Sequence, residues 1–344
     1  MASVVADNEQ VRPASPSAVR ETELSKRWRE IQWPLVFSKK LTANRMFVRS
    51  AIIRKDLLIN YARKHQLETF VVRSIDELEA IVSGESGRTV EPGAKRVGWV
   101  LKLSDSSNAY GIVCFQNMAR DALKEANVCD KDFREEPRIL QAYVKPLLIK
   151  KSGTDGQGHK FHIRTMVLAV GDLDVYMHKK PRAIIATRPW QAKEWGDDYT
   201  HITNQSINVE CEGYAEEHQN VRLSSVSFCD GRQNARAHHA EGLLEQMKQI
   251  IKDLFVDVSR ASKKSEFFPM RNCYELFGFD FLVDADGRVF LLEVNPEPSM
   301  RLFGFQKQEQ MVGPDPFSRV SPLTFSRVYS KSMLDALNKL RGIE

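Results

Sequence analysis

Two acidic side chains and a carboxamide lie in two neighbouring apolar runs near the C-terminal end of the sequence. Asp280 precedes the turn-forming residues 284–287, and Glu293 and Asn295 follow them. A turn between two apolar runs predicts an antiparallel hairpin. If the turn comprises residues 284–287, Asp280 lies opposite Leu291, and Glu293 is its diagonal neighbour on the same face.

Alternation along each strand then divides this hairpin into two faces. One face is expected to be wholly apolar: Phe277, Phe279, Phe281, Val283, Phe290, Leu292 and Val294. The other is expected to mix polar and apolar residues: Gly278, Asp280, Glu293, Asn295, Leu276, Leu282, Val289 and Leu291. Buried carboxylates need a compensating charge, and carboxylate and amide oxygens are ligands that Mg²⁺ prefers. The pattern predicts a magnesium site; the alternative is an exposed polar face of a sheet.

A second alternating segment, residues 160–164, places Lys160, His162 and Arg164 on one face of a strand. A lysine offers a compact charge for a phosphate, and an arginine offers a planar fork for a carboxylate. The segment therefore predicts an anion-binding face, with a solvated strand edge as the alternative.

The hairpin sequence ELFGFDFLVD followed by LLEVN resembles the metal-binding hairpin of the tubulin–tyrosine ligase family. The resemblance implies an ATP-grasp fold and a reaction that joins an amino group to a carboxylate through an acyl-phosphate. It also implies that Asp280, Glu293 and Asn295 are magnesium ligands, so that ATP and Mg²⁺ are the expected cofactors. Residues 160–164 resemble a Lys-Phe-Asp-Ile-Arg strand of the family, although His162 replaces the aspartate. Lys160 is thereby implied as a phosphate ligand and Arg164 as a carboxylate or transition-state ligand.

Three further segments resemble the family in the same order along the chain. Residues 99–102 (WVLK) resemble a strand whose lysine contacts ATP phosphates, which implies this role for Lys102. Residues 141–144 (QAYV) resemble the hinge beside the adenine, and residues 201–204 (HITN) resemble a His-Leu-Thr-Asn motif. The implied nucleotide contacts from these two segments are Gln141, Tyr143, Val144, Thr203 and Asn204.

The resemblance implies two more basic residues, whose alignment with the family is less certain. Lys55 resembles a basic contact from the N-terminal lobe, and Arg182 could supply a catalytic arginine, although a gap-free match places Ile184 there. The family's glycine-rich loop with a lysine is replaced by residues 104–111 (SDSSNAYG). This departure leaves reduced or altered activity open.

The expected fold class is α+β: an ATP-grasp fold with antiparallel and mixed sheets flanked by helices and a smaller N-terminal lobe. Helical patterns cover residues 52–61, 118–128, 243–258 and 327–341, and a capping box at residues 74–77 begins another helix. Strand patterns cover residues 97–103, 111–115, 139–144, 160–170 and 175–178. We expect a flexible segment at 1–25, an N-terminal lobe at 26–90, a central lobe at 91–150 and a C-terminal lobe at 151–344. Residues 208–241 are expected to form an irregular insertion in the last lobe.

Composition restricts the class of protein. Hydrophobic residues make up 42% and charged residues 28% of the 344 residues, which is typical of globular proteins. Neither a membrane-spanning run nor an apolar leader is evident, so no membrane partner is expected. Five cysteines without a C-x-x-C pair favour a reducing, cytoplasmic location, with cytoskeletal association left open. The net charge of +5 permits an acidic partner, and the dispersed basic residues argue against nucleic acid.

The resemblance implies a ligase that adds a free amino acid to a protein substrate with an acidic C-terminal tail. Tyrosine addition to the C-terminal glutamate of α-tubulin is the first expectation. A tubulin polyglutamylase or glycylase and a noncatalytic ATP-grasp scaffold are the alternatives. The basic residues Lys179, Lys180 and Arg182 could attract such a tail, or could belong to a solvated face.

Overall fold

The computed structural model describes residues 31–85, 96–105, 111–117, 119–151, 156–229, 240–296, 298–299 and 317–319. The expected flexible segment at 1–25, residues 106–110 of the departing loop and the expected helix at 327–341 lie outside these residues. The chain divides into two compact units, Met1–Ala43 and Asn44–Glu344. The described part of the first unit contains the short helix α2 (Trp33–Phe37), which has a proline in its first turn. The features below belong to the second unit.

A four-stranded antiparallel sheet has the strand order β1-β4-β2-β3. The strands are β1 (Thr69–Val72), β2 (Arg96–Leu103), β3 (Val113–Phe115) and β4 (Arg138–Val144). Its helices are α5 (Ile75–Ser83), α6 (Ala119–Glu125) and α7 (Asp130–Glu135). As the capping box predicts, the Ser74 hydroxyl accepts a hydrogen bond from the Glu77 amide at the start of α5. Side chains on alternate positions of β2, such as Trp99 and Leu101, share a core with these helices.

A nine-stranded sheet is built around the long strand β6 (Gly158–Val170). The path β10-β5-β6-β11-β12 is extended by β7 and β8, which both pair with β6, by β9 on β8 and by β13 on β7. The other strands are β5 (Leu148–Lys150), β7 (Asp174–His178), β8 (Arg182–Ile185), β9 (Asn220–Arg222), β10 (Ser227–Phe228), β11 (Tyr274–Val283), β12 (Val289–Pro296) and β13 (Phe317–Arg319).

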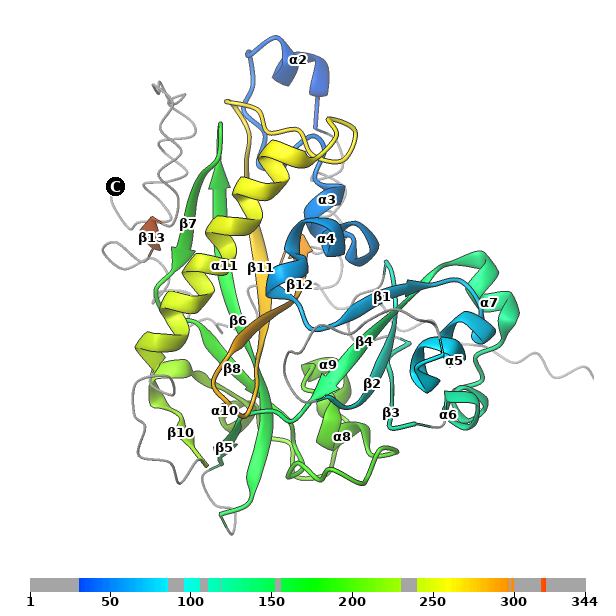
Figure 1. Cartoon of the computed structure of the whole chain (residues 1–344). Coiled ribbons are helices and arrows are strands. Elements are labelled where there is room, and N and C mark those ends of the chain that lie inside the picture. The colour runs from blue at the N-terminus through cyan, green and yellow to red at the C-terminus, as the bar shows by residue number, and fades with distance from the viewer. Residues whose placement is uncertain are drawn as a thin grey trace, which may run out of the picture. The chain divides into compact units, whose positions relative to one another are not determined.

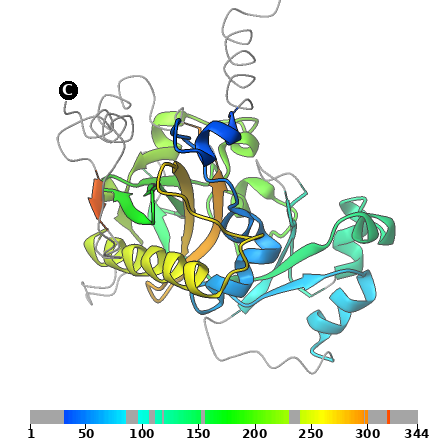
Figure 2. The same ribbon diagram turned by 90° about the horizontal axis from the view of Figure 1, so that it is seen from above.

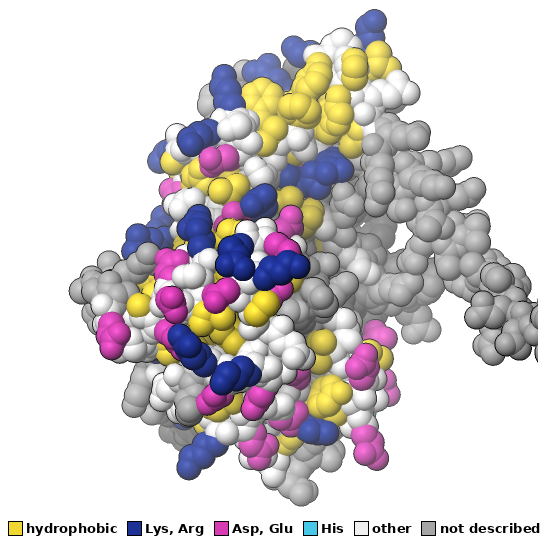
Figure 3. All heavy atoms as spheres, turned by 90° about the vertical axis from the view of Figure 1, so that its right-hand side faces the viewer, with side chains coloured by type: hydrophobic (Ala, Val, Ile, Leu, Met, Phe, Trp, Pro, Cys, Tyr) yellow, Lys and Arg dark blue, Asp and Glu magenta, His cyan; other side chains and the backbone are white. Residues whose placement is uncertain are grey.

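Helix α11 (Ala240–Ala261) lies across one face of this sheet (Figures 1 and 2). Its buried stripe includes Leu243, Met247, Ile251, Leu254 and Phe255, which pack with the phenylalanines of β6 and β11. Among the described residues, no helix combines the length and the apolar character that crossing a bilayer requires. Acidic and basic side chains are interspersed on the side that faces right in Figure 1 (Figure 3).

The β11–β12 hairpin corrects the predicted register. The turn is one residue longer than predicted, because Val283 pairs with Val289 and the Asp284 amide donates to the Arg288 carbonyl at 3.0 Å. Between Asp280 and Phe281 the register shifts again by a β-bulge. Asp280 therefore lies directly opposite Glu293 and not opposite Leu291.

The bulge also corrects the predicted division into faces, since its extra residue, Leu292, reverses the alternation along β12. The predicted core residues of β11 (Phe277, Phe279, Phe281 and Val283) and Val294 do belong to the core beneath α11. Val289 and Leu291 join this core, contrary to prediction. Phe290 and Leu292 instead pack with the core of the four-stranded sheet.

Two other predictions also need correction. The helix expected over residues 52–61 is divided by Arg54, whose backbone is extended, into α3 (Ser50–Ile53) and α4 (Lys55–Ala62). The expected irregular insertion at 208–241 contributes β9 and β10 to the large sheet, together with α10 (Glu216–Gln219) and the 3-10 helix η2 (Leu223–Ser225). These strands have two or three residues each, too few to show a clear sequence period.

Candidate active site

A cavity lies between the two sheets, and the space within it, together with the part open to solvent, amounts to about 880 Å³. Each sheet has one face covered by helices, so the alternate side chains of β2 and β6 are left to line this space. Val100 and Lys102 come from β2, and Lys160 and His162 come from β6. The cavity is thus formed where the faces of the two sheets that carry polar side chains meet.

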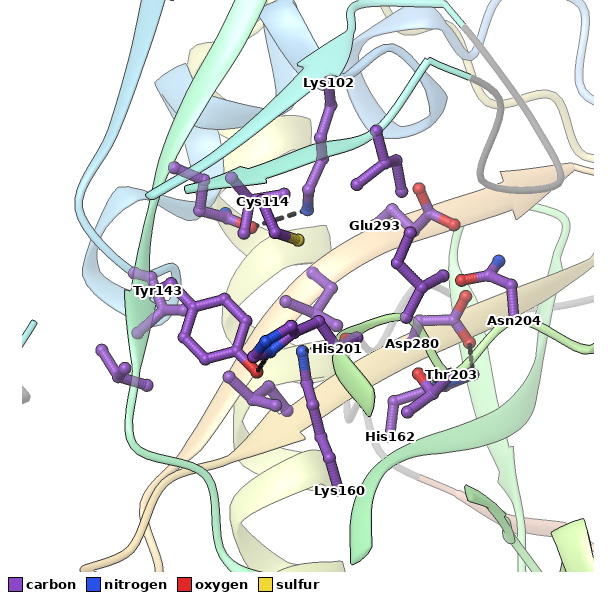
Figure 4. Close-up of a pocket in the computed structure, with 18 of the residues that line it drawn as sticks. Lys102, Cys114, Tyr143, Lys160, His162, His201, Thr203, Asn204, Asp280 and Glu293 are labelled. Atoms are coloured by element: carbon purple, nitrogen blue, oxygen red, sulfur yellow. Dashed lines mark hydrogen bonds and ion pairs between the residues drawn. The ribbon is translucent and has the colours of Figure 1, made fainter. Parts of the chain in front are cut away.

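Most residues that the family resemblance implied line this one cavity (Figure 4). They are Lys55, Lys102, Gln141, Tyr143, Val144, Lys160, Thr203, Asn204, Asp280 and Glu293. Arg164, Asn295 and Arg182 are not among the lining residues. Arg164 and Asn295 are hydrogen-bonded to the acid pair without lining the cavity. Arg182 lies on β8, the strand that pairs with β6 at Arg164.

Two lysines reach into the cavity from opposite walls (Figure 4). The Lys102 ammonium donates to Gln141 Oε1 at 2.7 Å, and the Lys160 ammonium donates to the His201 carbonyl at 2.6 Å. Lys160 also lies 4.2 Å from the centre of the Tyr143 ring. Burial lowers the pKa of both lysines to about 8. Both are therefore largely charged at neutral pH, and an anionic ligand between them would stabilise that charge.

Each member of the acid pair contacts one cationic side chain. Asp280, which is 3% exposed, accepts two hydrogen bonds from the Arg164 guanidinium, one of them at 2.7 Å to Oδ2. The Lys55 ammonium lies 3.3 Å from Glu293 Oε2. Burial alone would raise the pKa of Asp280, but the Arg164 charge and its hydrogen bonds lower the pKa below its ordinary value. Asp280 is therefore ionised.

Asn295 bridges the two carboxylates at the point where a cation would be held. Its amide nitrogen donates to Asp280 Oδ2 at 3.0 Å and to Glu293 Oε1 at 3.3 Å. A half-turn of the amide would present Oδ1 instead, giving three hard oxygen donors. Among the described residues no three His, Cys, Asp or Glu side chains could hold a metal by themselves. The donor set fits Mg²⁺ provided that Asn295 and ligand oxygens complete the coordination.

His162 changes the charge of the predicted anion-binding face. Its Nδ1 lies 2.6 Å from the Thr203 hydroxyl, and its Nε2 lies 3.6 Å from Asp280 Oδ1. Burial lowers the pKa of His162 to about 4, so the imidazole is neutral at neutral pH. The face is therefore cationic only at Lys160 and Arg164, and His162 serves to orient Thr203.

An aromatic cluster that sequence reasoning missed packs against two residues that line the cavity, Tyr143 and His201. The Tyr143 hydroxyl lies 2.9 Å from His201 Nδ1 and accepts from Trp190 Nε1 at 3.0 Å. Trp195 stacks on His201 with ring centres 5.0 Å apart, and a side chain at Gly98 would collide with it. In the sequence, the only indication of this cluster is that Trp190 and Trp195 shortly precede the HITN motif. The cluster fixes the Tyr143 ring and the carbonyl that Lys160 contacts.

Arg182 makes its contacts away from the cavity. Its Nε donates to Asn220 Oδ1 at 2.8 Å, and its Nη2 donates to the Asn220 carbonyl. Burial and the nearby Arg222 lower the pKa of Arg182 to about 10. Its catalytic role stays a prediction.

Comparison with known proteins decides the family. The model of the Tubulin-tyrosine ligase family matches residues 39–310. The chain belongs to this family. The fold also matches a solved structure of the C-terminal domain of K. lactis Pby1, described as an ATP-grasp enzyme interacting with the mRNA decapping enzyme Dcp2. That match has a TM-score of 0.55 and 24% identity over 87% of both chains, so this member of the tubulin–tyrosine ligase family has the ATP-grasp fold.

Curated relatives in the family carry several activities in their names. A probable tubulin–tyrosine ligase of Schizosaccharomyces pombe is 31% identical over 48% of this chain and 37% of its own length. The probable tubulin–tyrosine ligase PBY1 of Saccharomyces cerevisiae is 22% identical over 76% of this chain and 40% of its own length. A probable tubulin polyglutamylase of Homo sapiens, TTLL2, is 28% identical over 61% of this chain and 33% of its own length. The chain thus spans well under half the length of these relatives.

Proposed function

We propose that this chain is an ATP- and Mg²⁺-dependent carboxylate–amine ligase that adds an amino acid to an acidic protein tail. The observation that carries the proposal is the convergence of Lys102 and Lys160, from opposite sheets, on a cavity that also contains Asp280 and Glu293. Family membership and the ATP-grasp fold both support a ligase that uses ATP. The proposed acceptor is the C-terminal glutamate of α-tubulin, and the proposed amino acid is tyrosine.

The cavity has an apolar part and a charged part, as a nucleotide requires. Val100, Ile112, Val144, Leu282 and Leu292 line the apolar part and would enclose the base. Lys102 and Lys160 would neutralise phosphate oxygens. Asp280, Glu293 and Asn295 would hold Mg²⁺, which when bound supplies further positive charge to the transferring phosphoryl group.

The reaction needs no covalent bond to the enzyme. An oxygen of the acceptor carboxylate attacks the γ-phosphorus of ATP, the bond to ADP breaks, and an acyl-phosphate forms. The amine of the free amino acid then attacks the carbonyl carbon, the bond to phosphate breaks, and an amide forms with loss of a proton from the nitrogen. In this scheme the buried lysines and Arg164 bind and orient the anionic groups, so positioning and charge account for catalysis.

A second candidate activity is glutamate addition, because several curated relatives are named tubulin polyglutamylases. The test is to incubate the protein with ATP, Mg²⁺ and a peptide ending in glutamate, adding tyrosine, glutamate or glycine in turn. The proposal predicts ADP release and a peptide heavier by one tyrosine. If the peptide instead gains glutamate or glycine, that amino acid is the one added and tyrosine is not. ATP binding without ADP release for any amino acid, or no ATP binding, would favour the noncatalytic scaffold.

A further inference from the structure

The two lysines that reach into the cavity are held by oxygens of different kinds. Lys160 donates to the backbone carbonyl of His201 at 2.6 Å, and the chain fixes the direction of a backbone carbonyl. Lys102 donates instead to the side-chain oxygen of Gln141 at 2.7 Å. The oxygen and nitrogen ends of a carboxamide have nearly the same shape, so its hydrogen-bond partners decide which end faces the lysine. Lys102 therefore depends on a further residue for its acceptor.

Thr69 on β1 is the other partner of the Gln141 carboxamide. Gln141 Nε2 donates to Thr69 Oγ1 at 3.0 Å, and Thr69 Oγ1 lies 2.6 Å from the carbonyl oxygen of Leu67. A carbonyl oxygen can only accept, so the hydroxyl hydrogen of Thr69 points to Leu67. The Thr69 oxygen is then left as an acceptor, and only the amino end of the carboxamide can bind it. The carbonyl end of Gln141 consequently faces Lys102.

Strand pairing in the four-stranded sheet brings these side chains together. Thr69 on β1 pairs with Gln141 on β4, and Gln141 pairs with Val100 on β2. Lys102 follows Val100 by two positions, so its side chain lies on the same face and reaches Gln141 diagonally. Gln141 is 3% exposed and Thr69 is half-buried. A reversed carboxamide would direct an N–H group at the Lys102 ammonium and an oxygen at an acceptor, and burial makes such mismatches costly.

We propose that Thr69 is a positioning residue of the nucleotide site: its hydroxyl fixes the orientation of the Gln141 carboxamide and thereby holds the Lys102 ammonium in place for a phosphate of the nucleotide. Thr69 is not among the residues that line the cavity, so it acts through Gln141. The inference rests on the proposed function for the phosphate, whereas the orientation of Gln141 does not depend on it. Without the hydroxyl, the carboxamide is free to reverse, and its amino end would repel the ammonium.

The first measurement is the titration of Lys102 in the protein without nucleotide. It is followed by NMR of chains labelled with carbon-13 at lysine Cε, and the Lys102 signal is assigned with Lys102→Arg. Burial lowers the pKa of Lys102 to about 8. The ionisable groups that also influence this pKa are Glu293, Lys55, Cys114 and Asp280. Because burial raises the pKa of Cys114 to about 11, that thiol does not titrate in the same range.

Thr69→Val keeps the shape of the side chain and removes the hydroxyl. It should move the Lys102 titration down by about one pH unit, because a lost hydrogen bond to a charged group changes an equilibrium about tenfold. Thr69→Ser keeps the hydroxyl and should titrate like wild type. Melting temperatures report whether each variant is folded, and Thr69→Ala replaces Thr69→Val if the valine chain is not.

The second measurement is ATP affinity of the same variants by calorimetry. Thr69→Val should weaken it about threefold at pH 7.5 and about tenfold above pH 8, where less of Lys102 is charged. Thr165→Val is the matched control: Thr165 is buried on β6, and its hydroxyl donates to the His178 carbonyl at 3.4 Å. Thr165 alternates with Arg164 and so lies on the other face of the strand. Thr69→Ser and Thr165→Val should leave ATP affinity unchanged.

A double variant separates the orientation of Gln141 from other effects of Thr69. In Gln141→Glu the side chain presents an oxygen to Lys102 in either orientation, so adding Thr69→Val should not lower the Lys102 titration further. A wild-type Lys102 titration in Thr69→Val, or an equal downward shift in the Gln141→Glu chain, would overturn the inference. A shifted titration with unchanged ATP affinity would instead contradict the phosphate contact that the proposed function assigns to Lys102, while the orientation of Gln141 by Thr69 would stand.

Discussion

Asp280 and Glu293 face each other directly across the β11–β12 hairpin, because Leu292 is accommodated in a β-bulge. With the observed turn but no bulge, Asp280 would lie opposite Leu292, and Glu293 would project from the other face of the hairpin. The bulge therefore brings together the two acids between which Asn295 lies. Bulges are frequent next to active sites, where they redirect a side chain.

The Arg164–Asp280 pair is expected to contribute to stability as well as to function. Both side chains are largely buried, so Arg164→Gln leaves an unpaired carboxylate and should destabilise the fold by about 3–5 kcal/mol. Asp280→Asn should also destabilise, and the double variant should recover much of the loss. Chemical denaturation measures all three. Additive losses in the double variant would show that the two side chains do not act as a pair.

The same pair predicts how stability changes with acid. The pKa of Asp280 is lowered in the folded chain, so its stabilising contribution is complete above the ordinary aspartate pKa of about 3.9 and is lost as the pH falls through the lower folded value. The difference in unfolding free energy between wild type and Asp280→Asn should therefore shrink below about pH 4. A difference that stays constant from pH 6 to pH 3 would contradict this assignment.

The two buried lysines predict a pH dependence of nucleotide affinity. Because the pKa of Lys102 and of Lys160 is about 8, both lose charge in the unliganded protein as the pH rises through 8. ATP affinity, measured by calorimetry, should fall between pH 7 and pH 9. Lys102→Arg keeps its charge over this range and should flatten the profile in part. If Lys102→Arg shows the same pH dependence of ATP affinity as wild type, deprotonation of Lys102 does not cause that dependence.

Gly98 and Trp195 predict that the aromatic cluster supports the nucleotide site. A Cβ at position 98 would lie 2.3 Å from the Trp195 ring and 2.7 Å from the Phe115 carbonyl. Gly98→Ala should therefore displace Trp195, destabilise the chain by about 1–3 kcal/mol and weaken ATP binding several-fold. Trp195→Ala should weaken ATP binding similarly, and the double variant should bind no worse than either. Unchanged affinity in Gly98→Ala would show that the cluster does not position Tyr143 or Lys160.

The sequence was informative where chemistry and strand alternation coincide. Lys102, Lys160 and Asp280 each lie on a strand long enough to show its period, and all three line the same cavity, while their roles in binding stay predictions. The exact pairing of Asp280 was not predictable, because a bulge inserts a residue without leaving a mark in the pattern. The predicted face of Glu293 was correct, although the strand register from which it was predicted was wrong.

Other features depend on tertiary contacts that the sequence does not show. The strand that carries Arg222 has three residues and pairs with β8, which is distant in sequence. His162 and His201 are neutral because they are buried, and burial follows from the packing of two sheets. Trp195 gains its role through Gly98, nearly a hundred positions earlier. Such relationships follow from topology.

Calorimetric titration of the chain with ATP, with and without Mg²⁺, tests the central claim most directly when wild type and Glu293→Gln are compared. The substitution removes a charge from the acid pair at nearly constant volume, so the melting temperature should change little. We predict that Mg²⁺ strengthens ATP binding in wild type and that Glu293→Gln loses this strengthening, with turnover reduced at least about 100-fold. A Glu293→Gln variant that binds ATP with the same Mg²⁺ dependence as wild type would contradict the proposed metal site.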